Sequence, residues 1–304
     1  MSATTPATAS EAALITTPSK SGAPALMRLV ISCNDTPGIV AAVSQFLHSS
    51  GANIVRSDQY STDPSGGQFF LRMEFLLPAE TREGFAERFG LKVADRFQMG
   101  WRLWDAADKK RVTILVSRYD HCLLDLLWRW RHDELDGEIV QVISNWEDMR
   151  EEVESFGLPY HHVPVEKAQK SEAEARMLEL IDGRCDVVVL ARYMQVLSAE
   201  FLDLVGVPVI NIHHSFLPAF EGAGPYERAK ERGVKLVGAT AHYVTPELDA
   251  GPIIEQGVVR VNHGNTVEEI IQLGAEVERT VFARAVRWHC QDRVIRFGNS
   301  TVVF

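Results

Sequence analysis

The chain has 304 residues and a formal net charge of −10, from 31 basic and 41 acidic side chains. A chain of this length suits two domains of ordinary size, each with a buried core. It has no block of lysine or arginine, whereas nucleic-acid-binding proteins need a concentrated basic face. We therefore expect a small-molecule ligand and no nucleic-acid partner.

Cysteine spacing and apolar run length bear on the location of the protein. The four cysteines, Cys33, Cys122, Cys185 and Cys290, lack the close pairs typical of zinc sites and disulfide frameworks. The longest apolar runs have strand length and fall short of a membrane span. The sequence thus predicts a cytoplasmic protein with no metal centre and no membrane segment.

Residues 1–23, rich in Ser, Thr, Ala and Pro, are predicted to form a disordered tail.

Residues 24–107 are predicted to form a first domain. Strands are expected at residues 25–35, 52–63, 68–77 and 100–106, and helices at residues 36–51 and 80–98. In the first helix, apolar residues recur at helical spacing, with Pro37 in the first turn and Gly51 at the end. The β-α-β-β-α-β order is that of the ferredoxin-like unit.

The turn before the first helix, in the sequence NDTPGI, carries Asp35, Pro37 and Gly38. With GANI opening the second strand, it resembles the turn of ACT domains, which are small regulatory modules. The resemblance implies that these three residues lie beside an amino-acid effector. Free N–H groups at a helix N-terminus can hold the carboxylate of such an effector. The structural alternative is that Asp35 caps the helix and Pro37-Gly38 form an ordinary tight turn.

Residues 108–304 follow a different pattern. Five short β-branched runs, at residues 111–117, 137–145, 160–165, 185–193 and 207–215, alternate with helical patterns. This alternation indicates an open, mainly parallel α/β domain with helices on both faces of the sheet. Further strands within residues 233–261, a long helix at 266–290 and a hairpin at 293–304 complete the prediction. The first strand-to-helix turn lacks the glycine and lysine patterns of nucleotide sites, so we expect no nucleotide cofactor.

Polar residues end the fifth strand run, in the sequence VINIHHS. Ligands of such sheets bind beyond the carboxyl ends of the strands. Asn211 and His213 are two residues apart and share one strand face, whereas His214 is expected to point to the other face. The same alternation argues against one metal ion held by both histidines.

Asp249, in the sequence LDAGP, is the third candidate. An amide N–H and an imidazolium stabilise an oxyanion, while a carboxylate orients the imidazole or accepts a proton. Asn211, His213 and Asp249 therefore suit acyl transfer through a tetrahedral intermediate. Because no side chain has the pattern of a covalent nucleophile, attack by water or an amine is expected. The alternative is that all three are turn and capping residues.

The segment from residue 209 to 256 resembles the core of the formyltetrahydrofolate-dependent enzymes. It contains their Asn-x-His-x-Ser-x-Leu-Pro motif at residues 211–218 and their Leu-Asp-x-Gly motif at residues 248–251. The resemblance implies that Asn211 and His213 polarise a formyl carbonyl and that Asp249 relays protons. It also implies a set of folate-binding residues: Met194, Gln195, Val196, Leu197, His242, Val244 and Ser215. The role of Ser215 within this set is open.

Within that family, an ACT domain joined to this core is the arrangement of the deformylases. The resemblance implies hydrolysis of 10-formyltetrahydrofolate to tetrahydrofolate and formate, which supplies formate and balances the one-carbon folate pool. Folate is then a substrate and no cofactor is expected, while a homo-oligomer such as a tetramer is implied. His214 stands where amine-using transformylases generally have proline. The alternatives are formyl transfer to an amine and a catalytically silent folate sensor.

Overall fold

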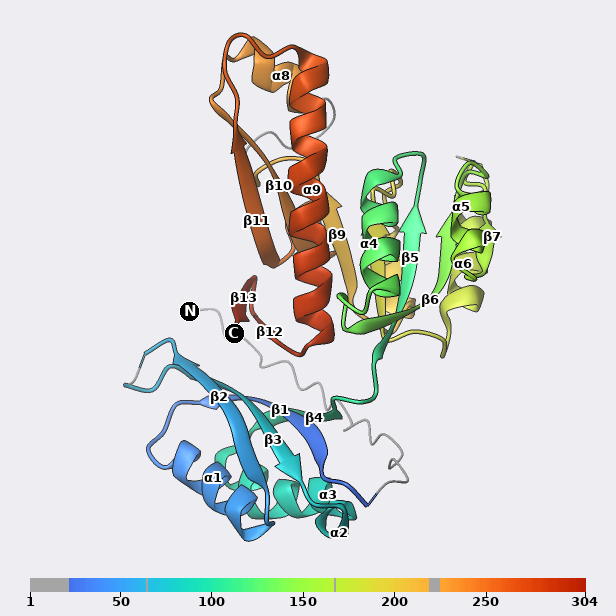
Figure 1. Cartoon of the computed structure of the whole chain (residues 1–304). Helices are drawn as coiled ribbons and strands as arrows, with labels where there is room; N and C mark the ends of the chain where they lie inside the picture. The colour runs from blue at the N-terminus through green and yellow to red at the C-terminus, as the bar shows by residue number, and fades with distance from the viewer. Residues whose placement is uncertain (1–21, 64, 167, 219–224) are drawn as a thin grey trace. The chain divides into compact units, whose positions relative to one another are not determined.

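The computed structural model describes residues 22–63, 65–166, 168–218 and 225–304. Most of the predicted tail, and residues 219–224 of the formyl-transfer core, lie outside these ranges. The chain divides into two compact units (Figure 1). The first unit ends at Asp108 and also includes Phe304, and the second unit runs from Lys109 to Val303.

The first unit, in its described residues, is a four-stranded antiparallel sheet with helices packed on one face (Figure 1). Its elements are β1 (Ala25–Asn34), α1 (Ile39–Ser49), β2 (Asn53–Ser61), β3 (Gln68–Leu77), α2 (Ala79–Arg82), α3 (Phe85–Phe89), the π-helix η1 (Gly90–Ala94), the 3-10 helix η2 (Asp95–Phe97) and β4 (Gly100–Asp105). The strand order β2-β3-β1-β4 confirms the predicted ferredoxin-like fold.

The turn before α1 differs from the prediction. The helix begins at Ile39, because Gly38 at the N-cap has a φ of 96°, a left-handed conformation that keeps Pro37 out of the helix. The structural alternative for Asp35 is also wrong. No side chain caps α1, and the Asp35 carboxylate instead accepts a hydrogen bond from the Ser61 hydroxyl in β2. The turn is thus tied to the sheet rather than to the helix.

The predicted continuous helix at residues 80–98 is wrong. Gly84 has a φ of 65° and separates α2 from α3, after which the chain continues as η1 and η2. Glycine adopts this conformation without a steric penalty, so this one residue ends the first helix and starts the second. Phe85 and Phe89 still pack on Phe46 of α1, with ring centroids 5.2 and 5.4 Å apart respectively.

The second unit, in its described residues, is built on a seven-stranded sheet. Its elements are β5 (Lys110–Val116), α4 (His121–Arg131), β6 (Gly137–Ser144), α5 (Arg150–Ser155), β7 (Tyr160–His162), α6 (Lys170–Ile181), β8 (Val187–Ala191), α7 (Ala199–Leu204), β9 (Val209–His213), α8 (Pro225–Glu231), β10 (Leu236–Tyr243), β11 (Ile253–Arg260), α9 (Val267–Cys290), β12 (Val294–Phe297) and β13 (Ser300–Val303). The order is β11-β10-β9-β8-β5-β6-β7, and in the described residues the antiparallel pairings are β9 with β10 and β10 with β11, while the other pairings are parallel. This confirms the open, mainly parallel α/β fold.

Helices cover both faces of this sheet (Figure 1). One apolar core joins the strands to α4, α5 and α9, and another joins them to α6 and α7. Central parallel strands are therefore apolar on both sides, and all of β8 is buried. No helix in the described ranges is both long and apolar enough to cross a bilayer.

Strand β9 lies where the sheet changes from parallel to antiparallel pairing. It pairs with β8 on one side and with β10 on the other. The register places Asn211 opposite His242, and His213 opposite Thr240. Residues directly opposite each other on neighbouring strands share a face. The two strands therefore present a row of polar side chains on one face of the sheet.

Candidate active site

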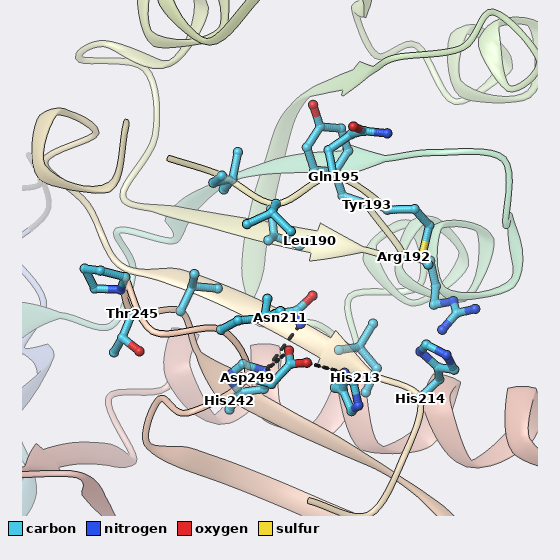
Figure 2. A pocket seen from close by; sticks show the side chains of 17 residues that line it. Leu190, Arg192, Tyr193, Gln195, Asn211, His213, His214, His242, Thr245 and Asp249 are labelled. Carbon is cyan, nitrogen blue, oxygen red and sulfur yellow. Dashed lines mark hydrogen bonds and ion pairs between the residues drawn. The ribbon is translucent and has the colours of Figure 1, made fainter. Parts of the chain in front are cut away.

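A cavity of about 280 Å³ lies over β8 and β9 and extends to the loop between β10 and β11 (Figure 2). Every catalytic or folate-binding candidate from the sequence lines it, except Ser215: Met194, Gln195, Val196, Leu197, Asn211, His213, His242, Val244 and Asp249. The structure thus brings together three segments that are far apart in the sequence.

The carboxylate of Asp249 is the centre of this group. Its Oδ2 lies 3.3 Å from Nδ1 of His213, and its Oδ1 lies 3.8 Å from Nε2 of His242. Nδ2 of Asn211 lies 3.3 Å from the same His242 nitrogen (Figure 2). Two strands and one loop therefore supply a continuous polar cluster at the cavity wall.

The backbone of the loop fixes the position of Asp249. Asp249 has a φ of 54°, which is uncommon for a residue other than glycine. The loop is closed at its base, where the Tyr243 N–H donates to the Pro252 carbonyl at 2.9 Å. A Cβ atom on Gly251 would lie 1.8 Å from the Tyr243 carbonyl oxygen, so only glycine fits there. The carboxylate is thus held against β9 by a tightly closed loop.

The hydrogen bonds of His242 indicate its tautomer. Nδ1 lies 2.9 Å from the carbonyl oxygen of Tyr243, which can only accept, so Nδ1 carries the hydrogen. Burial lowers the pKa of His242, which favours the neutral ring. Its Nε2 then accepts from the amide of Asn211, and this orients Asn211 toward the cavity.

The His213 ring and the Asp249 carboxylate face each other at the cavity wall. The hydrogen bond from His213 lowers the pKa of Asp249 despite its burial, so the carboxylate is ionised near neutral pH. Nε2 of His213 is buried and has no hydrogen-bond partner in the part of the chain that the structure describes. Buried polar atoms are normally paired, so this nitrogen is suited to an oxygen of a bound ligand.

His214 is a correction to the sequence prediction, because it also lines the cavity. β9 ends at His213, so the alternation of strand faces does not extend to His214. The two imidazole centroids are 5.2 Å apart. Burial, with the nearby positive charge of Arg192, lowers the pKa of His214 to about 4, so its ring is neutral at physiological pH.

Ser215 is buried but does not belong to the cavity lining. Its carbonyl oxygen accepts a hydrogen bond from the Thr240 hydroxyl at 2.9 Å, and the same hydroxyl accepts from the Leu217 N–H at 3.0 Å. This geometry fits a residue that shapes the segment after β9, while its contact with substrate stays a prediction.

Other residues of the lining were missed by the sequence analysis: Leu190, Arg192, Tyr193, Ile212, His214, Thr245, Pro246 and Leu248. Only Arg192 carried a signal that could have identified it. It is a charged residue directly after an apolar parallel strand, where ligands of such sheets bind.

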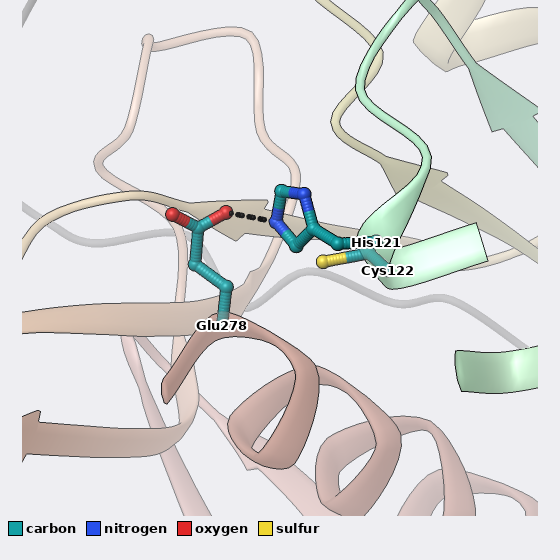
Figure 3. Close-up of side chains that lie close together, drawn as sticks. All are labelled: His121, Cys122 and Glu278. Atoms are coloured by element: carbon teal, nitrogen blue, oxygen red, sulfur yellow. Dashed lines mark hydrogen bonds and ion pairs between the residues drawn. The ribbon is translucent and has the colours of Figure 1, made fainter. Parts of the chain in front are cut away.

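A second polar cluster contains His121, Cys122 and Glu278, whose potential ligand atoms lie within 4.8 Å of one another (Figure 3). Glu278 already accepts a hydrogen bond from Tyr226 at 2.7 Å and lies 2.8 Å from Nε2 of His121. The Arg192 guanidinium, 3.4 Å away, opposes a second cation, and burial raises the pKa of the Cys122 thiol well above its usual value. We therefore interpret the cluster as a buried ionic network.

The regulatory candidates Asp35, Pro37 and Gly38 all lie in the turn between β1 and α1. A hollow in the first unit does not include them. It runs along α1, α2 and the segment after α2, and its basic side chains are Arg88, Lys92 and Arg96. The structure thus leaves the three candidates as a turn next to the N-terminus of α1.

Comparisons with known proteins agree with this geometry. Residues 110–286 match the family model described as formyl transferase, and residues 27–76 match the ACT domain. A formyltetrahydrofolate deformylase of Mycobacterium tuberculosis is 56% identical over 279 residues, which cover 91% of this chain and 90% of that protein. The chain belongs to the formyltetrahydrofolate deformylase family. The predicted family is thereby confirmed.

Solved structures separate two branches of related enzymes. The crystal structure of a formyltetrahydrofolate deformylase from Pseudomonas syringae has a TM-score of 0.87 at 51% identity and covers 92% of this chain and 94% of that one. A glycinamide ribonucleotide transformylase from Symbiobacterium toebii has a TM-score of 0.60 at 30% identity. The match covers 94% of the transformylase chain but only 64% of the present chain. The deformylase family therefore accounts for more of the chain.

The low pKa of His214 predicts a pH-dependent contribution to stability. Unfolding returns this pKa from about 4 toward 6.5, so the unfolded chain takes up the proton first as the pH falls. Stability present above pH 6.5 is then lost progressively toward pH 4. Between pH 8 and pH 5 the loss from this residue is about 2 kcal/mol. Urea unfolding at both pH values should show a smaller pH effect in His214→Gln, and an equal effect would contradict the assignment.

Proposed function

We propose that this protein hydrolyses 10-formyltetrahydrofolate to tetrahydrofolate and formate. The observation that carries the proposal is the convergence of Asn211, His213 and Asp249 at one wall of the cavity. The deformylases to which the chain is similar, over nine tenths of its length, support water as the acceptor.

The two ends of the cavity suit the two parts of the substrate. Leu190, Val196, Leu197 and Val244 contribute apolar lining, which suits the fused ring of the folate. The formyl group then lies at the polar end, over β9. Its carbonyl oxygen accepts hydrogen bonds from the Asn211 amide and from an N–H at Nε2 of His213, whose Nδ1 faces Asp249.

Hydrolysis proceeds through a tetrahedral intermediate. The oxygen of a water molecule bonds to the formyl carbon, and Asp249 accepts the proton that this water loses. Asn211 and His213 stabilise the negative charge that develops on the former carbonyl oxygen. The bond between carbon and N10 then breaks, and the proton held by Asp249 passes to N10. The products are tetrahydrofolate and formic acid, which releases its proton as formate.

The low pKa of Asp249 is compatible with this role. It keeps the carboxylate ionised and ready to accept a proton at neutral pH. The proton of the attacking water becomes acidic only as its oxygen bonds to carbon, so transfer to a weak base is then favourable. No step of this scheme passes through a metal or a nucleotide, and folate takes part as the substrate.

A formate-release assay on the purified full-length protein distinguishes hydrolysis from the alternatives. With 10-formyltetrahydrofolate and no amine, we expect formate and tetrahydrofolate in equal amounts. Loss of the formyl group only when an amine is added would support formyl transfer. Binding of folate without turnover would support a silent sensor.

Replacement of Asp249 tests the proton acceptor. Asp249→Asn keeps the shape of the side chain but removes the basic carboxylate, so kcat for formate release should fall by about 100-fold or more. Asp203→Asn, on the exposed surface of α7, is the matched control and should retain the activity of the parent protein. Full activity of Asp249→Asn would show that the proposed mechanism is wrong.

The ACT domain supports a small-molecule effector, which we propose to be an amino acid of one-carbon metabolism. The turn at Asp35, Pro37 and Gly38 precedes a helix whose first N–H groups have no side-chain cap. Such groups hold a carboxylate well. Titration of glycine and of methionine during formate release should change the rate for one of them. A constant rate with both would remove these two candidates.

We further propose that the chain forms a homo-oligomer, such as a tetramer, through its ACT sheet. β2 is an edge strand of that sheet and is mostly exposed along its length, including Val55 and Tyr60. An unpaired edge is a ready site for strand pairing with another copy. Light scattering measures this directly, and a monomer at assay concentrations would contradict it.

The proposed location is the cytoplasm. All four cysteines are free thiols, each of them buried. Reduced cysteines are typical of that compartment.

A further inference from the structure

Arg192 is a buried cation, and two of its three guanidinium nitrogens have no hydrogen bond in the described part of the chain. Its side chain is 8% exposed, and Nε and Nη1 are buried without a hydrogen bond in the described part of the chain. Its contacts there are an ion pair with Glu278, at 3.4 Å from Nε, and the ring of Tyr119, 4.7 Å from the guanidinium carbon. Buried guanidinium groups normally have most of their donors satisfied.

The backbone at Arg192 points to a functional side chain. It follows the last residue of β8 and has a φ of 60°, in the left-handed region where glycine is favoured. An arginine there strains the backbone, and strain of this kind concentrates at ligand sites. Glycine would fit this backbone conformation better than arginine. The group that arginine supplies and glycine lacks is the guanidinium.

The guanidinium lies on the same cavity as the catalytic residues. Figure 2 shows it next to His214, whose ring is 5.2 Å from that of His213. His214 is neutral and brings no counter-charge to this end of the cavity. Glu278 holds the Nε side of the guanidinium, and Glu278 is itself oriented by Tyr226. The Nη groups are therefore the donors left for a ligand.

We propose that Arg192 binds the product formate, as an anion subsite on the far side of His213 from the folate ring. The inference rests on the proposed hydrolysis. One formate oxygen comes from the carbonyl held by Asn211 and His213, and the other comes from the attacking water. The substrate formyl group is neutral, so the charge on which a guanidinium acts appears only as the reaction proceeds. A carboxylate matches two parallel N–H donors of arginine.

Product inhibition by sodium formate tests the subsite in the full-length protein. The formate inhibition constant should be about tenfold higher or more in Arg192→Gln, since charge-assisted hydrogen bonds are lost. Sodium chloride at equal ionic strength corrects for screening. Arg176→Gln, which removes an exposed arginine paired with Glu179 on α6, should leave the constant unchanged. Equal constants in Arg192→Gln and the parent protein would overturn the inference, as would a parent protein that formate does not inhibit.

A second variant guards against a folding defect in the first. Arg192→Gly removes the guanidinium and relieves the left-handed backbone, which offsets part of the cost of leaving Glu278 without its cation, and urea unfolding checks that it is folded. It should show the same loss of formate inhibition, and added guanidinium ion should restore part of it. Formate sensitivity like that of the parent protein in this variant would refute the subsite. Absence of formate release from the parent protein would instead refute the proposed hydrolysis, so the two failures are distinguishable.

Discussion

The contact between the Asp249 carboxylate and His213 is the constraint on which the site depends. The carboxylate comes from a loop and the imidazole from the end of β9, so their 3.3 Å approach requires the loop to fold back over the sheet. The change from parallel to antiparallel pairing at β9 makes this possible, because it places β10 and its loop next to Asn211 and His213. The Asp249 carboxylate then lies within 3.8 Å of both the His213 and the His242 rings.

Much of the fold could be predicted because its pattern is local. The strand at residues 68–77 was predicted at its observed bounds, and alternating βα units gave the parallel sheet. The failure at residues 80–98 came from Gly84. Residues 80–83 are all polar, and Gly84 takes a left-handed φ of 65°, so the helical apolar pattern begins only at Phe85.

The candidate site, like the fold, contains residues that the sequence predicted and residues that it did not. Asn211, His213 and Asp249 were found from motif residues, and the strand period correctly placed the first two on one face. His214 was misplaced because the period holds only inside a strand, and β9 ends one residue earlier. Arg192 directly follows the apolar run of β8, a signal that was not used, while its ion pair with Glu278 in α9 joins segments far apart in the sequence and no local pattern shows it.

Arg192 and Asp249 both have left-handed backbones, so in the proposed mechanism two of the side chains that act on the substrate stand at strained positions. Both positions suit glycine, so the lowest-energy backbone and the working side chain are not compatible there. Directed evolution for heat resistance alone would therefore favour loss of the very groups that line the cavity. A thermostable version of this protein has to be selected under turnover, with stabilising changes taken from surfaces away from β8 and the β10–β11 loop.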